Sequence, residues 1–342
     1  MSITKNFIAF AVMKFADNNL INLDEPVKKY LKDIPSKYNN VLIYQLLNHS
    51  SGIPDYVHII GYMAQANQTQ TPMEVLKPIF TESLEFNPGE KYAYSNSGYF
   101  LLGLLIEKVT GKKLSDYLKE NVFKPVEMNN TYLESDSTQN TLNAKGYTKL
   151  NGELKEEIRL NPSQYWAAGG IISTKDDLIK WDKALIKGII LQKKEINQMM
   201  QPSKVSNGTF SDYGFGFELL NMPTMKVAGN NGAGLGYNAS NLIFLNDGLT
   251  VIVLTNASNS NSTMIAKNIR DMVVSEIGTL NDTNEAQIKK DKLDLLVMQV
   301  LNDANTSIVN QIYFNDDAAV IKFKSEAANY IQSQGKLLNI QM

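Results

Sequence analysis

The sequence predicts an α+β protein, because its helical and strand patterns lie in separate parts of the chain. Apolar residues recur at helical spacing from Ser2 to Ala16 and again from Ser97 to Val109. Alternating segments that are typical of strands begin only near Tyr213. This order differs from the alternating strand and helix units of a parallel sheet, so we expect an antiparallel sheet.

The first helix should be buried, since apolar residues recur in it at helical spacing from Phe7 to Ala16. The pattern ends at Asp17-Asn18-Asn19. The second should end at Gly111, a typical C-terminal stop. A shorter helix is predicted from Ser115 to Glu120. The run Ser173-Thr174-Lys175-Asp176 has the form of a capping box and predicts the start of another helix.

Strands are predicted in the second half of the chain, and a turn at Asn246-Asp247-Gly248 indicates a hairpin. A helix from Met264 to Glu276 would lie against this sheet. The four predicted strands are Tyr213 to Leu219, Thr224 to Ala228, Leu242 to Leu245 and Leu249 to Thr255.

The composition becomes polar from about Asn281, with a helical pattern from Ile288 to Leu301. We therefore divide the chain into a main domain, residues 1–280, and a linker with a partial C-terminal accessory region, residues 281–342.

The composition argues against several classes of protein. The 33 Lys and Arg residues nearly balance the 35 Asp and Glu residues, and a net charge of -2 gives no attraction to a phosphate backbone. We therefore expect no nucleic-acid partner. There is no cysteine, and neither His49 nor His58 lies in a metal-ligand spacing, so we expect no metal and no cofactor. No apolar run approaches the roughly 18 residues of a membrane helix.

Ser2-Ile3-Thr4-Lys5 forms an S-x-x-K pattern at the start of the first helix. Residues three apart share a helical face, so the lysine ammonium can reach the serine hydroxyl. Burial and the positive end of the helix dipole would lower the pKa of Lys5 and let it accept a proton. On its own the pattern is common, and an N-cap serine followed by a solvated lysine is the simpler interpretation.

Two further segments could join such a site. Tyr94 and Asn96 lie two residues apart before the second helix, so a phenol and an amide can face one cleft. The alternative is a packed aromatic followed by an N-cap. Gly229 to Gly236 contains four glycines, which permit close approach of backbone N–H groups to a ligand, although the segment could be a loop that simply turns.

Taken in order, the three segments resemble the serine beta-lactamase and penicillin-binding-protein superfamily, in particular its class C-like serine hydrolases, the esterases and D-alanyl-D-alanine carboxypeptidases. The intervening sequence is similar too, as at Leu46 to Ile53 and Ala168 to Ile171. The resemblance spans about Ser2 to Gly278. It implies an antiparallel sheet flanked by helices, plus an all-helical subdomain.

The resemblance also implies roles for individual residues. Ser2 would be the acylated nucleophile, Lys5 its proton acceptor and Tyr94 the second acid–base group. The substrate-binding residues that it implies are Asn96, Asn230, Gly232 and Ala233, with the backbone N–H groups of Ser2 and Ala233 forming the oxyanion hole.

Asn230 stands where the family usually has Lys or His, and an amide carries no charge for a substrate carboxylate. The resemblance implies a small-molecule or peptide substrate, cleaved at an ester or amide. Esterase or D-amino-acid peptidase activity is favoured over beta-lactamase activity. The alternative is a non-catalytic homologue that binds penicillin or acts as a sensor.

The family places strands of its central sheet before the S-x-x-K, so the resemblance implies that these N-terminal strands are missing from this sequence. It also implies an extracytoplasmic location, while the sequence begins without a signal-peptide pattern.

Overall fold

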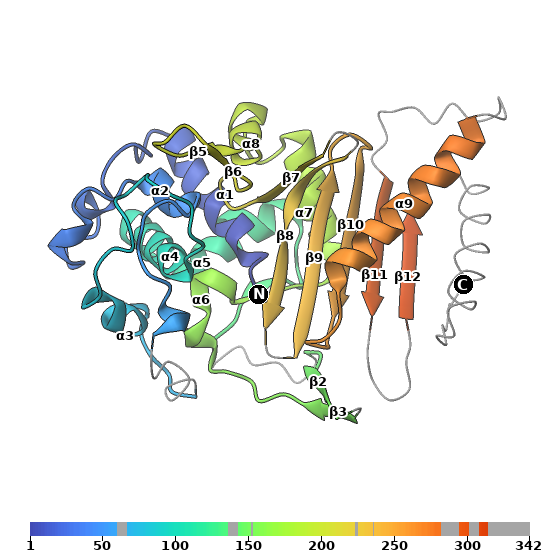
Figure 1. Cartoon of the computed structure of the whole chain (residues 1–342), viewed down its shortest axis with the longest axis horizontal. Helices are drawn as coiled ribbons and strands as arrows, with labels where there is room; N and C mark the ends of the chain where they lie inside the picture. The colour runs from blue at the N-terminus through green and yellow to red at the C-terminus, as the bar shows by residue number, and fades with distance from the viewer. Residues whose placement is uncertain are drawn as a thin grey trace. The chain divides into compact units, whose positions relative to one another are not determined.

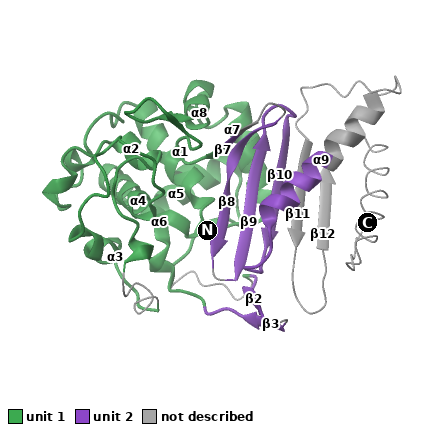
Figure 2. Ribbon diagram, viewed as in Figure 1, with its two compact units in different colours: residues 1–143, 159–219 green, residues 144–158, 220–342 purple. Residues whose placement is uncertain are grey.

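The computed structural model describes residues 1–59, 67–135, 143–151, 153–222, 225–234, 236–281, 294–300 and 308–313. The chain forms two compact units (Figure 2). The first consists of residues 1–143 and 159–219, and the second of residues 144–158 and 220–342.

The first unit is mainly helical (Figure 1). It also contains two short antiparallel strand pairs, β1 (Tyr132–Leu133) with β4 (Ile171–Ile172) and β5 (Ser203–Lys204) with β6 (Phe210–Ser211). Its helices are α1 (Thr4–Asp17), α2 (Ile43–Leu47), α3 (Pro72–Leu76), α4 (Asn96–Thr110), α5 (Leu114–Leu118), α6 (Trp166–Gly169), α7 (Lys175–Lys187) and α8 (Lys193–Met199).

Helix α1 lies at the centre of this unit's core. Every residue from Thr4 to Met13 is buried. The rings of Phe7 and Phe10 pack on Trp181 of α7, with centroids 4.3 and 5.1 Å apart. A helix that is apolar on all sides must be covered on all sides, so the predicted burial of the first helix is confirmed.

Helix α4 extends one residue beyond the predicted range at each end and stops at Gly111 as predicted. The hydroxyl of its N-cap, Ser95, accepts a hydrogen bond from the Gly98 N–H at 3.3 Å. Gly111 ends the helix with a left-handed φ of 67°. The shorter predicted helix is α5, which continues into a π-helical turn at Lys119–Phe123.

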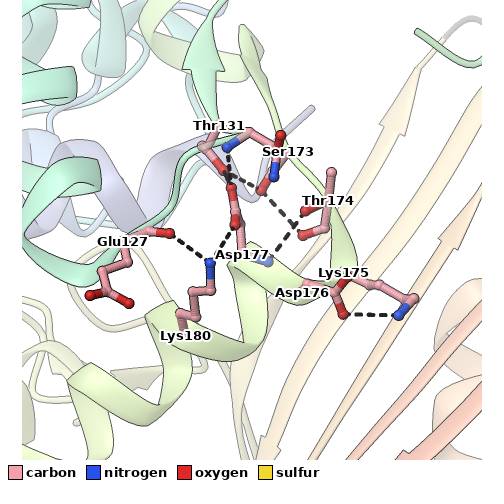
Figure 3. A network of polar contacts seen from close by, with 9 residues as sticks. Glu127, Thr131, Ser173, Thr174, Lys175, Asp176, Asp177 and Lys180 are labelled. Carbon is pink, nitrogen blue, oxygen red and sulfur yellow. Dashed lines mark hydrogen bonds and ion pairs between the residues drawn. The ribbon is translucent and has the colours of Figure 1, made fainter. Parts of the chain in front are cut away.

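The start of α7 is fixed by the buried carboxylate of Asp177 (Figure 3). It accepts hydrogen bonds from the Asn130 N–H at 2.7 Å and the Thr131 hydroxyl at 2.9 Å. The N-cap is Thr174, whose hydroxyl accepts from the Asp177 N–H, and not Ser173 as the capping box predicts. Either of two adjacent hydroxyl residues can serve as a cap, and here Thr174 does so while the Ser173 hydroxyl hydrogen-bonds to the Thr131 hydroxyl.

The second unit is built on a sheet whose strand order is β12-β11-β10-β9-β8-β7. Strands β8, β9 and β10 are antiparallel neighbours, as predicted, whereas β11 pairs with β10 in parallel. Helix α9 (Ser262–Asn281) packs on this sheet through Ala266 and Ile269, which contact a core that includes Phe244 and Val251 (Figure 1). A separate hairpin pairs β2 (Tyr147–Leu150) with β3 (Glu153–Glu156). The sheet strands are β7 (Glu218–Met222), β8 (Met225–Gly234), β9 (Tyr237–Phe244), β10 (Leu249–Thr255), β11 (Asp294–Val300) and β12 (Ile308–Tyr313).

Strand β8 is longer than predicted. It runs into the glycine-rich segment Gly229 to Gly236 instead of ending before it. Asn230 lies opposite Asn241 and Gly232 opposite Ala239 in the register with β9. A Cβ at Gly229 would lie 2.1 Å from the Asn241 carbonyl oxygen. The glycine here allows close strand packing, and pairing with β9 overrides the low strand propensity of Asn and Gly.

Two other predictions are corrected. Strand β7 begins at Glu218 and not at Tyr213, because Gly216 has a left-handed φ of 79° and packs against α1, where a Cβ would lie 2.8 Å from the Lys5 carbonyl oxygen. The helix predicted over residues 288–301 is wrong where β11 lies, since a short apolar run fits either a helix or a strand. Helix α9 ends at Asn281 and residues 282–293 lie outside the described part, so the domain division at residue 280 stays a prediction.

Candidate active site

Ser2 and Lys5 lie together at the start of α1. The Lys5 N–H donates to the Ser2 carbonyl oxygen at 3.0 Å, and this tight turn puts both side chains on one face. Lys5 Nζ lies 3.3 Å from Ser2 Oγ. The lysine side chain is fully buried, while Ser2 is only partly buried. The solvated lysine of the simpler interpretation is therefore wrong.

The ammonium of Lys5 has an acceptor for each of its three protons. Besides Ser2 Oγ, these are Asn96 Oδ1 at 2.8 Å and the Ala168 carbonyl oxygen at 2.7 Å. The last two can accept hydrogen bonds but cannot donate them. When Lys5 is a neutral amine, its two remaining N–H groups stay on these two oxygens, and its lone pair points toward the hydroxyl of Ser2.

The pKa of Lys5 suits this exchange of a proton. Burial lowers it from 10.5 to about 7, and the charges of Asp55 and Glu218 offset part of that effect. Near neutral pH a large share of Lys5 is therefore a free amine that can accept a proton.

Tyr94 completes the group around Ser2. Its hydroxyl donates a hydrogen bond to Ser2 Oγ at 2.8 Å, and its ring centroid lies 4.8 Å from Lys5 Nζ. Burial raises the pKa of the Tyr94 phenol above its ordinary value, so the group is a neutral proton donor. The structure thus brings Ser2, Lys5, Tyr94 and Asn96 together from the start of α1 and the start of α4.

His49 holds the Tyr94 segment, a role that the sequence analysis did not identify. Its carbonyl oxygen accepts from the Ala93 N–H at 2.9 Å, and its Nδ1 accepts from the Ser95 N–H at 3.1 Å. The imidazole also packs on the Tyr94 ring, with centroids 4.4 Å apart. Burial, together with the charge of Lys5, lowers the pKa of His49 well below its ordinary value, so the ring is neutral and can accept at Nδ1.

The remaining predicted residues, Asn230, Gly232 and Ala233, lie on β8 of the second unit. Asn230 is buried there. The next residue, Asn231, accepts hydrogen bonds at Oδ1 from the hydroxyls of Ser240 and Thr263, each at 2.7 Å. This end of β8 is therefore fixed to β9 and to the start of α9 by side chains as well as by strand pairing.

The described residues contain no group of three or more His, Asp or Glu side chains that could hold a metal ion. In the same part of the chain, no helix is both long enough and apolar enough to cross a membrane.

A mainly helical unit, a sheet whose strands β8, β9 and β10 are antiparallel, and a serine–lysine–tyrosine group at the start of a buried helix together define one class of protein. The sequence profile of the beta-lactamase family matches residues 1–275, and the chain belongs to this family. The predicted family and the α+β fold are both confirmed.

Penicillin-binding protein 4* of Bacillus subtilis is 29% identical over 272 residues, which cover 75% of this chain and 59% of the relative. A putative penicillin-binding protein, PbpX, of the same organism is 27% identical over 250 residues, covering 73% of this chain and 59% of the relative. The chain thus spans 59% of the length of each of these relatives.

Solved structures are similar as well. The octameric penicillin-binding protein homologue from Pyrococcus abyssi has a TM-score of 0.67 and 29% identity, covering 80% of this chain and 65% of that one. The D-amino acid amidase from Ochrobactrum anthropi SV3 has a TM-score of 0.60 and 27% identity, covering 70% and 71%.

Proposed function

We propose that the protein is a serine hydrolase that forms an acyl-enzyme on Ser2 and then hydrolyses it. Its substrate is an ester or an amide, and amides of D-amino acids are the favoured class. The observation that carries the proposal is the set of hydrogen bonds of Lys5 Nζ. Asn96 Oδ1 and the Ala168 carbonyl oxygen can only accept hydrogen bonds, so among these three partners only the hydroxyl of Ser2 can give Lys5 a proton.

In the acylation step, neutral Lys5 takes the proton of Ser2 as Oγ bonds to the substrate carbonyl carbon. The bond to the leaving group breaks, and the Tyr94 hydroxyl gives its proton to that group. In deacylation, the Tyr94 phenolate takes a proton from water as the water oxygen attacks the ester. Lys5 returns its proton to Ser2 Oγ, so both groups regain their starting states.

The preference for esters and amides over penicillins rests on Asn230. A neutral amide at the place where the family usually has a cation provides weaker binding to a substrate carboxylate. The similar solved structures include a D-stereospecific amidohydrolase and a D-amino acid amidase, which supports an amide of a D-amino acid as the substrate. Gly232 and Ala233 remain the other proposed substrate-binding residues of this segment.

Covalent labelling tests the proposal directly. We expect a fluorophosphonate to label Ser2, as located by mass spectrometry of the digested protein, and a short-chain p-nitrophenyl ester to turn over. A fluorescent penicillin should label the protein more slowly than the fluorophosphonate. Fast penicillin labelling without ester turnover would replace the proposal by the non-catalytic, penicillin-binding alternative.

The pH dependence should follow Lys5. Because the neutral amine is the active form and its pKa is about 7, kcat/KM for the ester should rise with pH and level off above about 7. Below this pH it should fall about tenfold per pH unit. A rate that stays constant between pH 5 and 7 would exclude Lys5 as the proton acceptor.

A further inference from the structure

Asp55 is a buried carboxylate next to the candidate active site, and the proposed reaction gives it no role. The residue is only 5% exposed. Oδ2 accepts a hydrogen bond from Asn96 Nδ2 at 2.8 Å, and Oδ1 accepts from the Val57 N–H at 3.2 Å. The Asn96 backbone N–H is a further hydrogen-bond donor to this carboxylate. The Asp55 carboxylate therefore binds both the side-chain amide and the backbone N–H of Asn96.

The segment that carries Asp55 is attached to α4 on both sides of this residue. The hydroxyl of Ser97, in the first turn of α4, donates to the Pro54 carbonyl oxygen at 2.7 Å. The same hydroxyl accepts from the Tyr56 N–H at 2.9 Å. Asp55 is thus held at a fixed position beside the start of α4. Burial raises the pKa of the Asp55 carboxyl above its ordinary value, while the donors of Val57 and Asn96 and the charge of Lys5 favour the ionised form.

This arrangement determines which end of the Asn96 amide faces Lys5. An ionised carboxylate only accepts hydrogen bonds, so Nδ2 of Asn96 must face Asp55. Oδ1 then faces Lys5 and accepts from Nζ. In the flipped amide Nδ2 would face Nζ, and the lone pair of neutral Lys5 would turn toward Asn96 and away from Ser2.

We propose that Asp55 is a positioning residue for Lys5, which acts through Asn96 by fixing the amide in the orientation that leaves the lysine lone pair directed at Ser2. The inference rests on the proposed function of Lys5 as proton acceptor. It adds a buried chain of contacts, Asp55 to Asn96 to Lys5, behind the nucleophile.

The charge of Asp55 acts on Lys5 together with those of its other neighbours. Asp55 and Glu218 raise the pKa of Lys5 against the larger effect of burial. The other titratable groups that face Lys5 are the Met1 amino group, His49, Tyr94 and Tyr99. Removal of the Asp55 charge should therefore lower the pKa of Lys5 below about 7.

The test compares Asp55→Asn with Asp177→Asn in the full chain. Asn at position 55 keeps the shape of the side chain but has a single acceptor oxygen for the donors of Val57 and Asn96, so it cannot enforce the amide orientation. Asp177 is also a buried carboxylate, with a backbone donor, a hydroxyl donor and an ion pair to Lys180 at 3.2 Å (Figure 3). It therefore controls for the loss of a buried charge as such.

Two readouts are needed, the pH profile of ester hydrolysis and the NMR titration of Lys5 in protein labelled with 13Cε-lysine. In Asp55→Asn we expect the pKa of Lys5 to fall by about one unit, with a plateau kcat/KM at least about tenfold lower. Asp177→Asn should leave both values close to wild type even where it lowers the melting temperature. Asp55→Glu, which retains a carboxylate acceptor, should keep the pKa of Lys5 near that of wild type.

An unchanged pKa of Lys5 in Asp55→Asn, or equal losses of activity in the two Asp→Asn variants, would overturn the positioning role. The NMR titration needs no turnover. If Ser2 is never acylated, the proposed function fails while the titration still shows whether Asp55 controls Lys5. If Asp55→Asn does not fold, Asp55→Glu replaces it. A pKa of Lys5 in Asp55→Glu as low as that expected without a charge at position 55 would then contradict the inference.

Discussion

In a Ser2→Ala variant we expect hydrolysis of the p-nitrophenyl ester to fall by at least about a thousandfold, since the group that bonds to the substrate carbonyl carbon is removed. Fluorophosphonate labelling should disappear together with turnover. Ser2 is partly buried and lies before the first residue of α1, so the substitution leaves the core of the first unit intact. The melting temperature should therefore remain close to that of the unmodified protein.

Ser211→Ala is the matched control for the nucleophile. Ser211 is a part-buried serine whose hydroxyl donates to the Ser203 carbonyl oxygen at 3.3 Å, and it has no role in the proposed reaction. Its variant should retain full activity. Activity in Ser2→Ala within tenfold of the unmodified protein would exclude Ser2 as the nucleophile.

Lys5→Met should give the second large effect, on activity and on the pH dependence of stability. Met has a similar length and no basic nitrogen, so ester hydrolysis should again fall by at least about a thousandfold. The pKa of Lys5 is about 7 in the folded protein and 10.5 in the unfolded chain, so between these pH values the unfolded chain binds more protons. The free energy of unfolding therefore gains about 1.4 kcal/mol per pH unit from Lys5 in this window, and the variant lacks this gain.

Urea unfolding at several pH values between 6 and 10 measures this difference. Lys14→Met provides the control on the same helix, since Lys14 Nζ contacts only the Asn121 carbonyl oxygen, at 3.4 Å, among the contacts described for its side chain. It should retain activity and the pH slope. If the unmodified protein and Lys5→Met show parallel free energies of unfolding over this range, the pKa of Lys5 is not depressed.

The parts of the fold that the sequence predicts well are those with strong local signals. Helix α4 has an apolar face, a serine N-cap and a glycine stop, and the β9–β10 hairpin has an Asn-Asp-Gly turn between two apolar strands. These signals need no information from elsewhere in the chain. The extent of β8 could not be predicted in this way, since Asn230 to Gly234 becomes a strand only through pairing with β9.

The same distinction holds for the candidate site. Ser2 and Lys5 are separated by one helical turn, so their contact follows from local geometry. Tyr94 and Asn96 were assigned to the site through the family resemblance, and the structure places both against the start of α1. His49 and Asp55 were missed as parts of the site, because their contacts join residues 41 and 46 positions apart in the sequence and neither residue belongs to a recognised catalytic pattern.

The position of Lys5 inside the central helix also limits how this protein can lose activity. In many enzymes the catalytic groups lie on loops that open well below the temperature at which the core unfolds. Here, Phe7, two residues after Lys5 on α1, packs on both Trp181 and Phe123, so the base is displaced only when the core of the first unit opens. The temperature at which activity is lost should therefore coincide with the thermal unfolding of this unit, and amide hydrogen exchange along α1 should occur only through its complete unfolding.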